Sequence, residues 1–173
     1  AVFKETGLIG YLSGNEARGL NWIDGKVESC VLIVDDENKH KVSLEVIESK
    51  SNLKLKMEND APQVTIDIEV TSNIGEQMSQ DDIYDENELV LLKNKQNGVV
   101  KKEAEEAINF AQKNNVDILG INNVIYHKYP LEWDNIKNNI REVLKKAKIT
   151  VNVKSKINRT YRIKDPIRMQ GGE

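Results

Sequence analysis

The sequence predicts an α+β domain, with a mainly antiparallel sheet of about five strands and helices packed on one face. Between positions 27 and 70, apolar and polar residues alternate in segments joined by short polar connections, a pattern typical of an antiparallel meander. From about position 85 to 147, apolar residues recur with helical spacing. Alternation returns from position 148, so a last strand is expected to close the sheet.

The first part of the chain predicts a hairpin followed by a short helix. Two short strands flank a turn at positions 5–7. Ser13 and Glu16 form a capping box, in which each side chain binds a backbone N–H that the helix leaves unpaired. A helix from about Gly14 to Asp24 is expected, and Gly25 is a natural C-terminal stop.

Four strands are then expected before position 71. VESCVLIV ends as a continuous apolar run, typical of a central strand that is covered on both faces. HKVSLEVIESK, NLKLKM and QVTIDIEV alternate, so each is expected to have one buried and one exposed face. The fifth strand, KITVNVKSKI, places four apolar residues inward, namely Ile149, Val151, Val153 and Ile157.

The second half predicts helices. A long amphipathic stretch follows the acidic segment at positions 81–88, and a kink or a break is an open alternative at Asn97-Gly98, since a mid-helix glycine costs about 1 kcal/mol relative to alanine. Asp117 is the expected cap of a shorter helix, DILGINNVIYHK. Pro130 fits the first turn of the next helix, PLEWDNIKNNIREVLKK, where a missing N–H costs nothing.

Length and composition indicate a single domain, residues 1–173, of ordinary globular type. The chain has 25 Lys and Arg against 28 Asp and Glu, so the whole molecule does not indicate nucleic-acid binding. Cys30 lies in an apolar run and is expected to be a buried, unreactive thiol. No apolar stretch approaches the roughly 20 residues of a membrane span. The chain is interpreted as a fragment of a longer protein, with a flexible tail from about position 165.

Catalytic and metal motifs are weak. GYLSG lies between a strand and a helix, but Ser13 is one residue away from the position of a hydrolase nucleophile, and the capping box already explains it. The polar segment DDENKH (Asp35, Asp36, Glu37, His40) is most simply a solvated turn, and the acids at positions 81–88 a helix start. We therefore predict no catalytic residue, no cofactor and no metal.

The segment YHKYPLEW, residues 126–133, concentrates three aromatic rings around Pro130. Helical spacing places Tyr129 and Trp133 on the apolar sides of two successive helices, so these rings are expected to pack across a helix–proline–helix corner, with His127 exposed. A flank of this corner is the candidate interaction surface, formed by Asn123, His127, Tyr129 and Trp133.

Three blocks carry a resemblance to a known family. LIGYLSGNEARGLNWIDGKV, KVSLEVIESKSNLKLK and VDILGINNVIYHKYPLEW resemble, in order and spacing, the C-terminal domain of the C subunit (the Ger(x)C lipoprotein family) of Ger-type nutrient receptors in spore germination. The resemblance extends from Phe3 to about Arg162. It implies a non-enzymatic assembly component that lies at the inner spore membrane, outside the spore core. The lipid that would anchor it is attached to an N-terminal segment absent from this chain. It also implies integral-membrane A and B subunits as partners. A module that binds a small nutrient directly, beside the aromatic corner, is the alternative.

Charge is distributed unevenly along the chain. Ten acidic residues and no Lys or Arg lie between Met57 and Leu92, whereas basic residues dominate from Arg141 onward. Such asymmetry is typical of a basic surface for anionic lipid or nucleic acid. Alternation offers another explanation, which we favour. Asp67 and Glu69 on one strand would face Lys154 and Lys156 on a neighbouring strand.

Overall fold

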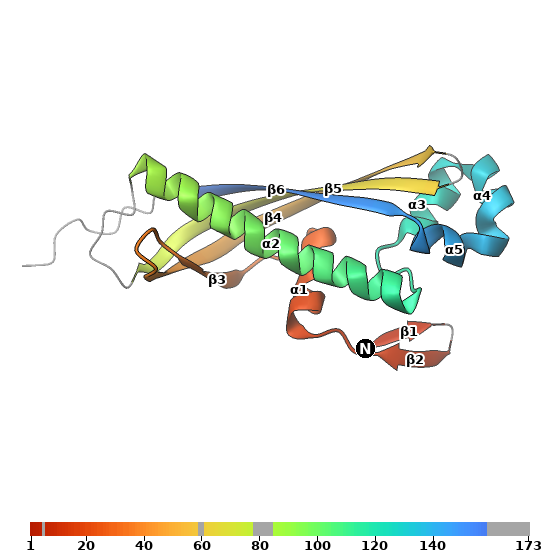
Figure 1. Ribbon diagram of the computed structural model, residues 1–173, viewed down its shortest axis with the longest axis horizontal. Helices are drawn as coiled ribbons and strands as arrows, with labels where there is room; N and C mark the ends of the chain where they lie inside the picture. Colours follow the sequence, from red (N-terminus) through yellow and green to blue (C-terminus); the bar gives the residue numbers. More distant parts are fainter. Residues whose placement is uncertain (5, 59–60, 78–84, 159–173) are drawn as a thin grey trace, which may run out of the picture.

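The structure is a computed structural model that describes residues 1–4, 6–58, 61–77 and 85–158. A four-stranded sheet carries a long helix across one face, and a separate two-stranded sheet lies near the N-terminus (Figure 1). The predicted α+β class is confirmed. The tail predicted to be flexible from about position 165 lies outside the described residues, as do positions 81–84 of the acidic segment.

The N-terminal hairpin and the first helix form as predicted. Strands β1 (Val2–Lys4) and β2 (Gly7–Gly10) pair antiparallel. Helix α1 (Gly14–Ile23) begins with both bonds of the capping box, Glu16 N to Ser13 Oγ at 3.2 Å and Ser13 N to Glu16 Oε2 at 2.6 Å. The helix ends before Gly25, whose φ of 64° is a left-handed conformation that favours glycine.

The main sheet has the strand order β3-β4-β5-β6, with two antiparallel pairs and one parallel pair, so it is mixed rather than purely antiparallel. Strands β3 (Cys30–Asp35), β4 (Lys41–Glu58) and β5 (Ala61–Gln77) pair antiparallel in sequence. Strand β6 (Lys148–Asn158) pairs parallel to β5. The predicted number of about five strands is thus corrected to four, and the sheet contains one parallel pair.

The strand count is lower because two predicted strands are one. The two predicted strands are separated at Ser51, within the polar run at positions 49–52, but this run continues β4. The register between β4 and β5 shifts between Val46 and Glu48, as at a β-bulge. Ser49 then turns its hydroxyl toward Val27, donating to the carbonyl oxygen at 2.8 Å. The hydroxyl of Ser49 is therefore hydrogen-bonded although the polar run lies within a long strand.

The last strand is parallel because a long helix carries the chain back along the sheet. Helix α2 (Glu86–Asn114) follows β5 and crosses the sheet along its length (Figure 1). The chain then enters β6 opposite Gln63, near the start of β5. A helical crossover of this kind is what a parallel pair requires. No break occurs at Gly98, since Gln96 and Val100 on either side of it are both fully buried.

Short helices fill the connection between α2 and β6. They are α3 (Ile121–Lys128), α4 (Pro130–Ile136), a 3₁₀ turn η1 (Lys137–Asn139) and α5 (Ile140–Lys145). The single helix predicted after Pro130 is thus divided into three pieces. These helices gather at one end of the sheet, opposite the end that carries β3 (Figure 1).

The core lies between one face of the sheet and helices α1 and α2. Alternate residues of every strand in the sheet contribute to it, together with the apolar sides of both helices, and Ile121 and Ile125 of α3 extend it at one end. Its largest fully buried apolar side chains are Trp22, Leu32, Leu44, Leu55, Ile66, Ile68, Leu92 and Ile125. The opposite face of the sheet is open. Strand β3, predicted to be central and covered on both faces, is instead an edge strand that exposes Val31 and Ile33.

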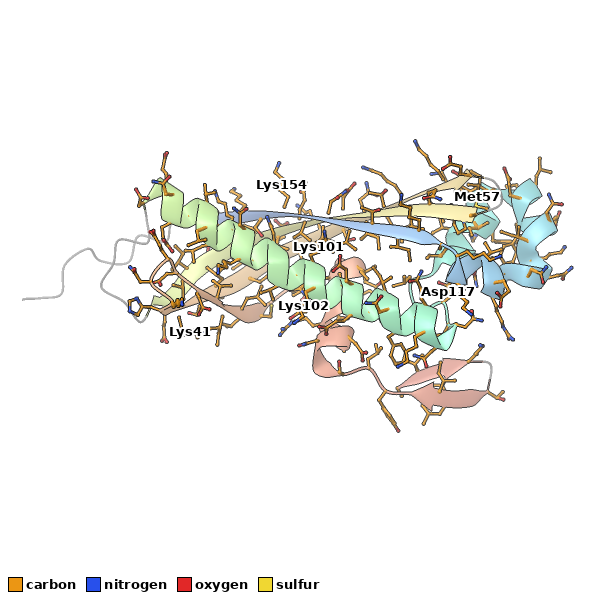
Figure 2. The ribbon with its side chains drawn as sticks, in the orientation of Figure 1. Lys41, Met57, Lys101, Lys102, Asp117 and Lys154 are labelled. Atoms are coloured by element: carbon orange, nitrogen blue, oxygen red, sulfur yellow. The ribbon has the colours of Figure 1, made fainter. Side chains whose placement is uncertain are left out.

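The open face carries opposite charges on neighbouring strands. Strands β5 and β6 are neighbours, as the favoured explanation of the charge asymmetry requires, and Glu69 lies opposite Lys154, which projects away from α2 (Figure 2). Asp67 takes its lysine from the other side, because Lys54 of β4 binds it at 2.7 Å. Asn152 of β6 adds a hydrogen bond of 2.9 Å. These two bonds lower the pKa of Asp67 below the ordinary aspartate value.

Candidate interaction surface at the aromatic corner

A proline sets the geometry of the corner between α3 and α4. The residue before a proline is driven out of the helical region, and Tyr129 has φ −136° and ψ 63°. Its N–H still closes α3 by donating to the carbonyl oxygen of Ile125 at 2.8 Å, while its own carbonyl oxygen accepts from Trp133 N at 2.8 Å. Pro130 occupies the first position of α4, as predicted. The backbone at the corner is therefore paired on both sides.

Tyr129 fastens the corner to the sheet. Its half-buried ring packs against the core, and its hydroxyl donates to the carbonyl oxygen of Leu55, on β4, at 2.8 Å. The ammonium group of Lys128 lies 5.8 Å from the centre of the same ring. A buried tyrosine hydroxyl with a backbone partner is a common way to fix a ring in one orientation.

The exposed flank is an aromatic cluster centred on Tyr126. The Tyr126 ring meets the Trp133 ring edge to face, with centroids 5.7 Å apart and an interplanar angle of 77°. It meets the His127 ring in the same way at 5.0 Å and 84°. His127 is exposed, and its Nδ1 lies 2.8 Å from the carbonyl oxygen of Asn123. Edge-to-face pairs of this kind favour one arrangement of the rings.

The structure places the four predicted surface residues close together but in different roles. Asn123 and His127 are exposed, whereas Tyr129 and Trp133 are half-buried supports. The ring that contacts Trp133 is that of Tyr126, not that of Tyr129.

Sequence reasoning missed two exposed apolar members of the corner, Tyr126 (54% exposed) and Leu131 (79% exposed). Both lie off the apolar stripes of their helices, next to Ile125 and Pro130 respectively. A large apolar residue outside the stripe is the signal that could have found them.

Asp117 holds the entry to α3. Its two carboxylate oxygens accept from Ile121 N at 2.9 Å and from Asn122 N at 2.7 Å, so it caps the helix as predicted, although Gly120 stands at the N-cap position. Figure 2 shows Asp117 between the end of α2 and α3. The corner is thus held at its entry by Asp117 and at its turn by Tyr129.

The two acidic segments that were considered as metal sites have structural roles in the parts that the structure describes. Asp36 is buried in the turn between β3 and β4, where it accepts from His40 N at 2.7 Å. Asp85 caps α2 and accepts from Asn87 N at 2.9 Å. Over the described ranges, no group of three or more His, Cys, Asp or Glu side chains could hold a metal ion.

A partly buried ion pair joins α1 to α2. Glu103 accepts from Arg18 Nε at 2.8 Å, from Arg18 Nη2, and from Trp22 Nε1 at 2.8 Å. The bond to Glu103 raises the pKa of Arg18. Nearby Cys30 is half-buried, and loss of solvent raises the pKa of its thiol, as expected of an unreactive cysteine. The carboxylate of Glu103 is thus saturated by donors from the neighbouring helix.

Two further observations concern ligands and membranes. A cavity lined by Ala111, Asn115, Leu144 and Ile149, among others, has a volume of about 10 Å³, which is about the space that one water molecule needs. None of the helices in the described parts of the chain is both long and apolar enough to cross a membrane.

Comparisons with known proteins agree on one family. Residues 1–161 match the family model described as spore germination B3/GerAC like, C-terminal. The chain is similar to spore germination protein KC of Bacillus subtilis (strain 168), with 28% identity over 173 residues that cover 98% of this chain and 42% of that protein. It is also similar to the crystal structure of the GerBC protein, with a TM-score of 0.73 and 21% identity, over 86% of this chain and 47% of that one. At this identity the likeness to GerBC shows the fold alone. The chain thus spans less than half the length of both proteins.

Proposed function

The chain belongs to the spore germination B3/GerAC-like family, matched by its C-terminal model, and we propose that it is a non-catalytic assembly part of a germinant receptor. The match over residues 1–161 is the observation that carries the proposal. The similarity to a protein named for spore germination supports the same process. In this proposal the domain contributes to germination by contacting other proteins.

The proposed contact surface is the aromatic corner. Exposed Tyr126 and Leu131 stand on a base fixed by Tyr129 and Pro130, so a partner would meet large apolar side chains that are already ordered. Aromatic residues in such settings carry much of the binding energy of protein interfaces. Asn123 and His127 lie at the same corner and would form its polar part.

The proposed partners are the A and B membrane subunits of the receptor. The whole protein is proposed to be held at the inner spore membrane, outside the spore core, by a lipid on an N-terminal segment that precedes this domain. These proposals rest on the family and on the resemblance of the three sequence blocks. They concern the longer protein, of which this chain corresponds to less than half in its relatives.

The serine that a hydrolase hypothesis would use is engaged in a structural bond. Ser13 Oγ accepts from the backbone N–H of Glu16 in α1.

A direct nutrient sensor is the competing function. Calorimetry of the domain with amino acids and sugars separates the two, because saturable binding with a defined stoichiometry would favour the sensor.

Co-purification tests the assembly role. The full-length protein, tagged and extracted from spore membranes in mild detergent, should recover the A and B subunits. The variant Tyr126→Ser/Leu131→Ser should recover much less of both. Val90→Ser is the matched control, since Val90 is a 53% exposed apolar residue on α2. Equal recovery by all three proteins, at unchanged thermal stability, would refute the corner as the contact.

A further inference from the structure

A second surface lies at the other end of the sheet from the aromatic corner. On the open face, β3 exposes Val31 (57%) and Ile33 (65%), two alternate residues of an edge strand. Ile47, at the bulge of β4, is 44% exposed. Contiguous apolar side chains on an otherwise polar sheet face mark interaction sites more often than scattered ones do.

The exposed residues border an open hollow in the sheet. Its lining comes from three neighbouring strands: Val31 and Ile33 of β3, Ser43 and Glu45 of β4, and residues 73–76 of β5. The hollow persists because position 75 is a glycine, at which a Cβ atom would come within 2.8 Å of Ser43 Oγ. The same hydroxyl accepts from Glu76 N at 2.6 Å and donates to Glu76 O at 3.1 Å, so the floor of the hollow is held in place.

The charges around the hollow are acidic and unmatched. Glu45 and Glu76 both line it, and within the described parts of the chain neither makes an ion pair. The rest of the open face differs, because Lys54 of β4 binds Asp67 there. The apolar end of the face is thus negatively charged, and this negative charge opposes binding to an anionic membrane.

The two edge strands of the sheet differ in the side chains that they carry on the open face. Edge strand β6 carries lysines on the open face, at positions 148, 154 and 156, and charged side chains of this kind protect an edge from pairing with another chain. Edge strand β3 carries valine and isoleucine at the corresponding places. The β3 edge therefore lacks the protection that the β6 edge has.

We infer that the β3 end of the open face binds a segment of a partner protein in which two apolar side chains are flanked by lysine or arginine. The apolar side chains would cover Val31 and Ile33, and the basic groups would face Glu45 and Glu76. A second copy of this chain fits less well, because a symmetric contact would place the glutamates of both copies together. The inference concerns a surface at the opposite end of the sheet from the aromatic corner and does not depend on that corner.

Peptide binding tests the inference. The probe is a fluorescein-labelled ten-residue peptide of alternating valine and lysine, and the control peptide has glutamate in place of lysine. Fluorescence anisotropy with the 173-residue chain should show saturable one-to-one binding of the lysine peptide, weakening as salt is raised. No binding of the lysine peptide, or equal binding of both peptides, would overturn the inference.

Variants locate the site. Val31→Thr/Ile33→Thr keeps residues that favour strands, and it should weaken binding about tenfold or more, equivalent to about 1.4 kcal/mol. Glu45→Gln/Glu76→Gln should weaken it similarly and reduce the salt dependence. The matched control, Leu8→Thr/Ile9→Thr on exposed strand β2, should bind as the parent does. Circular dichroism checks that each variant keeps its fold.

The other occupants give distinct results. Sedimentation velocity reports a second copy, and a dimer that Val31→Thr/Ile33→Thr abolishes would overturn the inference in favour of self-association. Co-flotation with vesicles containing phosphatidylserine reports a membrane. Vesicle binding that depends on the same two residues would overturn the inference in favour of lipid.

Discussion

Replacing Gly19 by alanine should loosen the contact between α1 and α2. A Cβ atom at this position would lie 2.0 Å from the carbonyl oxygen of Glu103 and 2.6 Å from its carbonyl carbon. Both are backbone atoms, so no rotation of a side chain can relieve the overlap. The helices would have to separate, which would stretch the hydrogen bond of 2.8 Å between Trp22 and Glu103.

The expected loss of stability follows from two opposing effects. Overfilling a packed contact costs about 1–3 kcal/mol, and more where rigid backbone is the obstacle. Alanine is better than glycine within a helix by about 1 kcal/mol, which offsets part of the loss. Because the overlap at Gly19 is deep and would disturb the partly buried ion pair of Glu103, we expect a net loss of about 2 kcal/mol.

Urea unfolding followed by circular dichroism measures this change, and the chain offers a control with the opposite sign. Gly98 lies exposed inside α2, where a Cβ atom would meet nothing within 4 Å. Gly98→Ala should therefore increase the free energy of unfolding by about 0.5–1 kcal/mol. If Gly19→Ala were neutral or stabilising, as Gly98→Ala is expected to be, the close approach of the two helices would be refuted.

Three further predictions concern the hydrogen bonds of individual side chains. Tyr129→Phe removes the hydroxyl that binds Leu55 O at 2.8 Å and should cost about 1 kcal/mol in the same urea measurement, whereas no change would mean that the corner is not fastened to β4. Ser13→Ala removes one bond of the capping box and should also cost about 1 kcal/mol, with Gly14→Ala as a neighbouring control that loses no cap. Asp67 has a lowered pKa in the folded state, so its contribution to stability is present above the ordinary aspartate pKa and is lost as the pH falls through the folded value. Asp67→Asn should accordingly flatten the dependence of unfolding free energy on pH between about pH 5 and pH 2, and an unchanged slope would contradict the bonds from Lys54 and Asn152.

Local patterns predicted the elements well because they depend on neighbouring residues. The capping box of α1 and the entry of Pro130 into α4 both formed as expected. The inward residues of β6 were also correct, since a period of two allows one choice of face once Val151 is buried.

The way the sheet closes was harder to predict. Strand β6 pairs parallel to β5 because α2 returns the chain to the start of β5, and the sequence contained that signal in the long helical stretch between the two strands. The apolar run of β3 led to the wrong prediction that this strand is central and covered on both faces. The side chains of Val31 and Ile33 are exposed to solvent, so their apolar character does not reflect burial.

The candidate site shows the same division. Helical spacing and Pro130 predicted the turn between the two helices, but not which rings touch. The contact between Tyr126 and Trp133 depends on side-chain directions that spacing does not determine. Glu103 lies 85 positions after Arg18, and no local pattern links the two. A polar contact between residues so far apart in the sequence can be identified only after the fold is known.

The central claim is that this domain acts through protein contacts at the aromatic corner, and crosslinking in spores tests it most directly. A photo-reactive benzoylphenylalanine at position 131 of the full-length protein would replace a side chain that is 79% exposed. The same group at position 90 serves as the control. The account predicts light-dependent crosslinks to an A or B subunit from position 131 and none from position 90. Germination with normal kinetics and no crosslink from position 131 would contradict it.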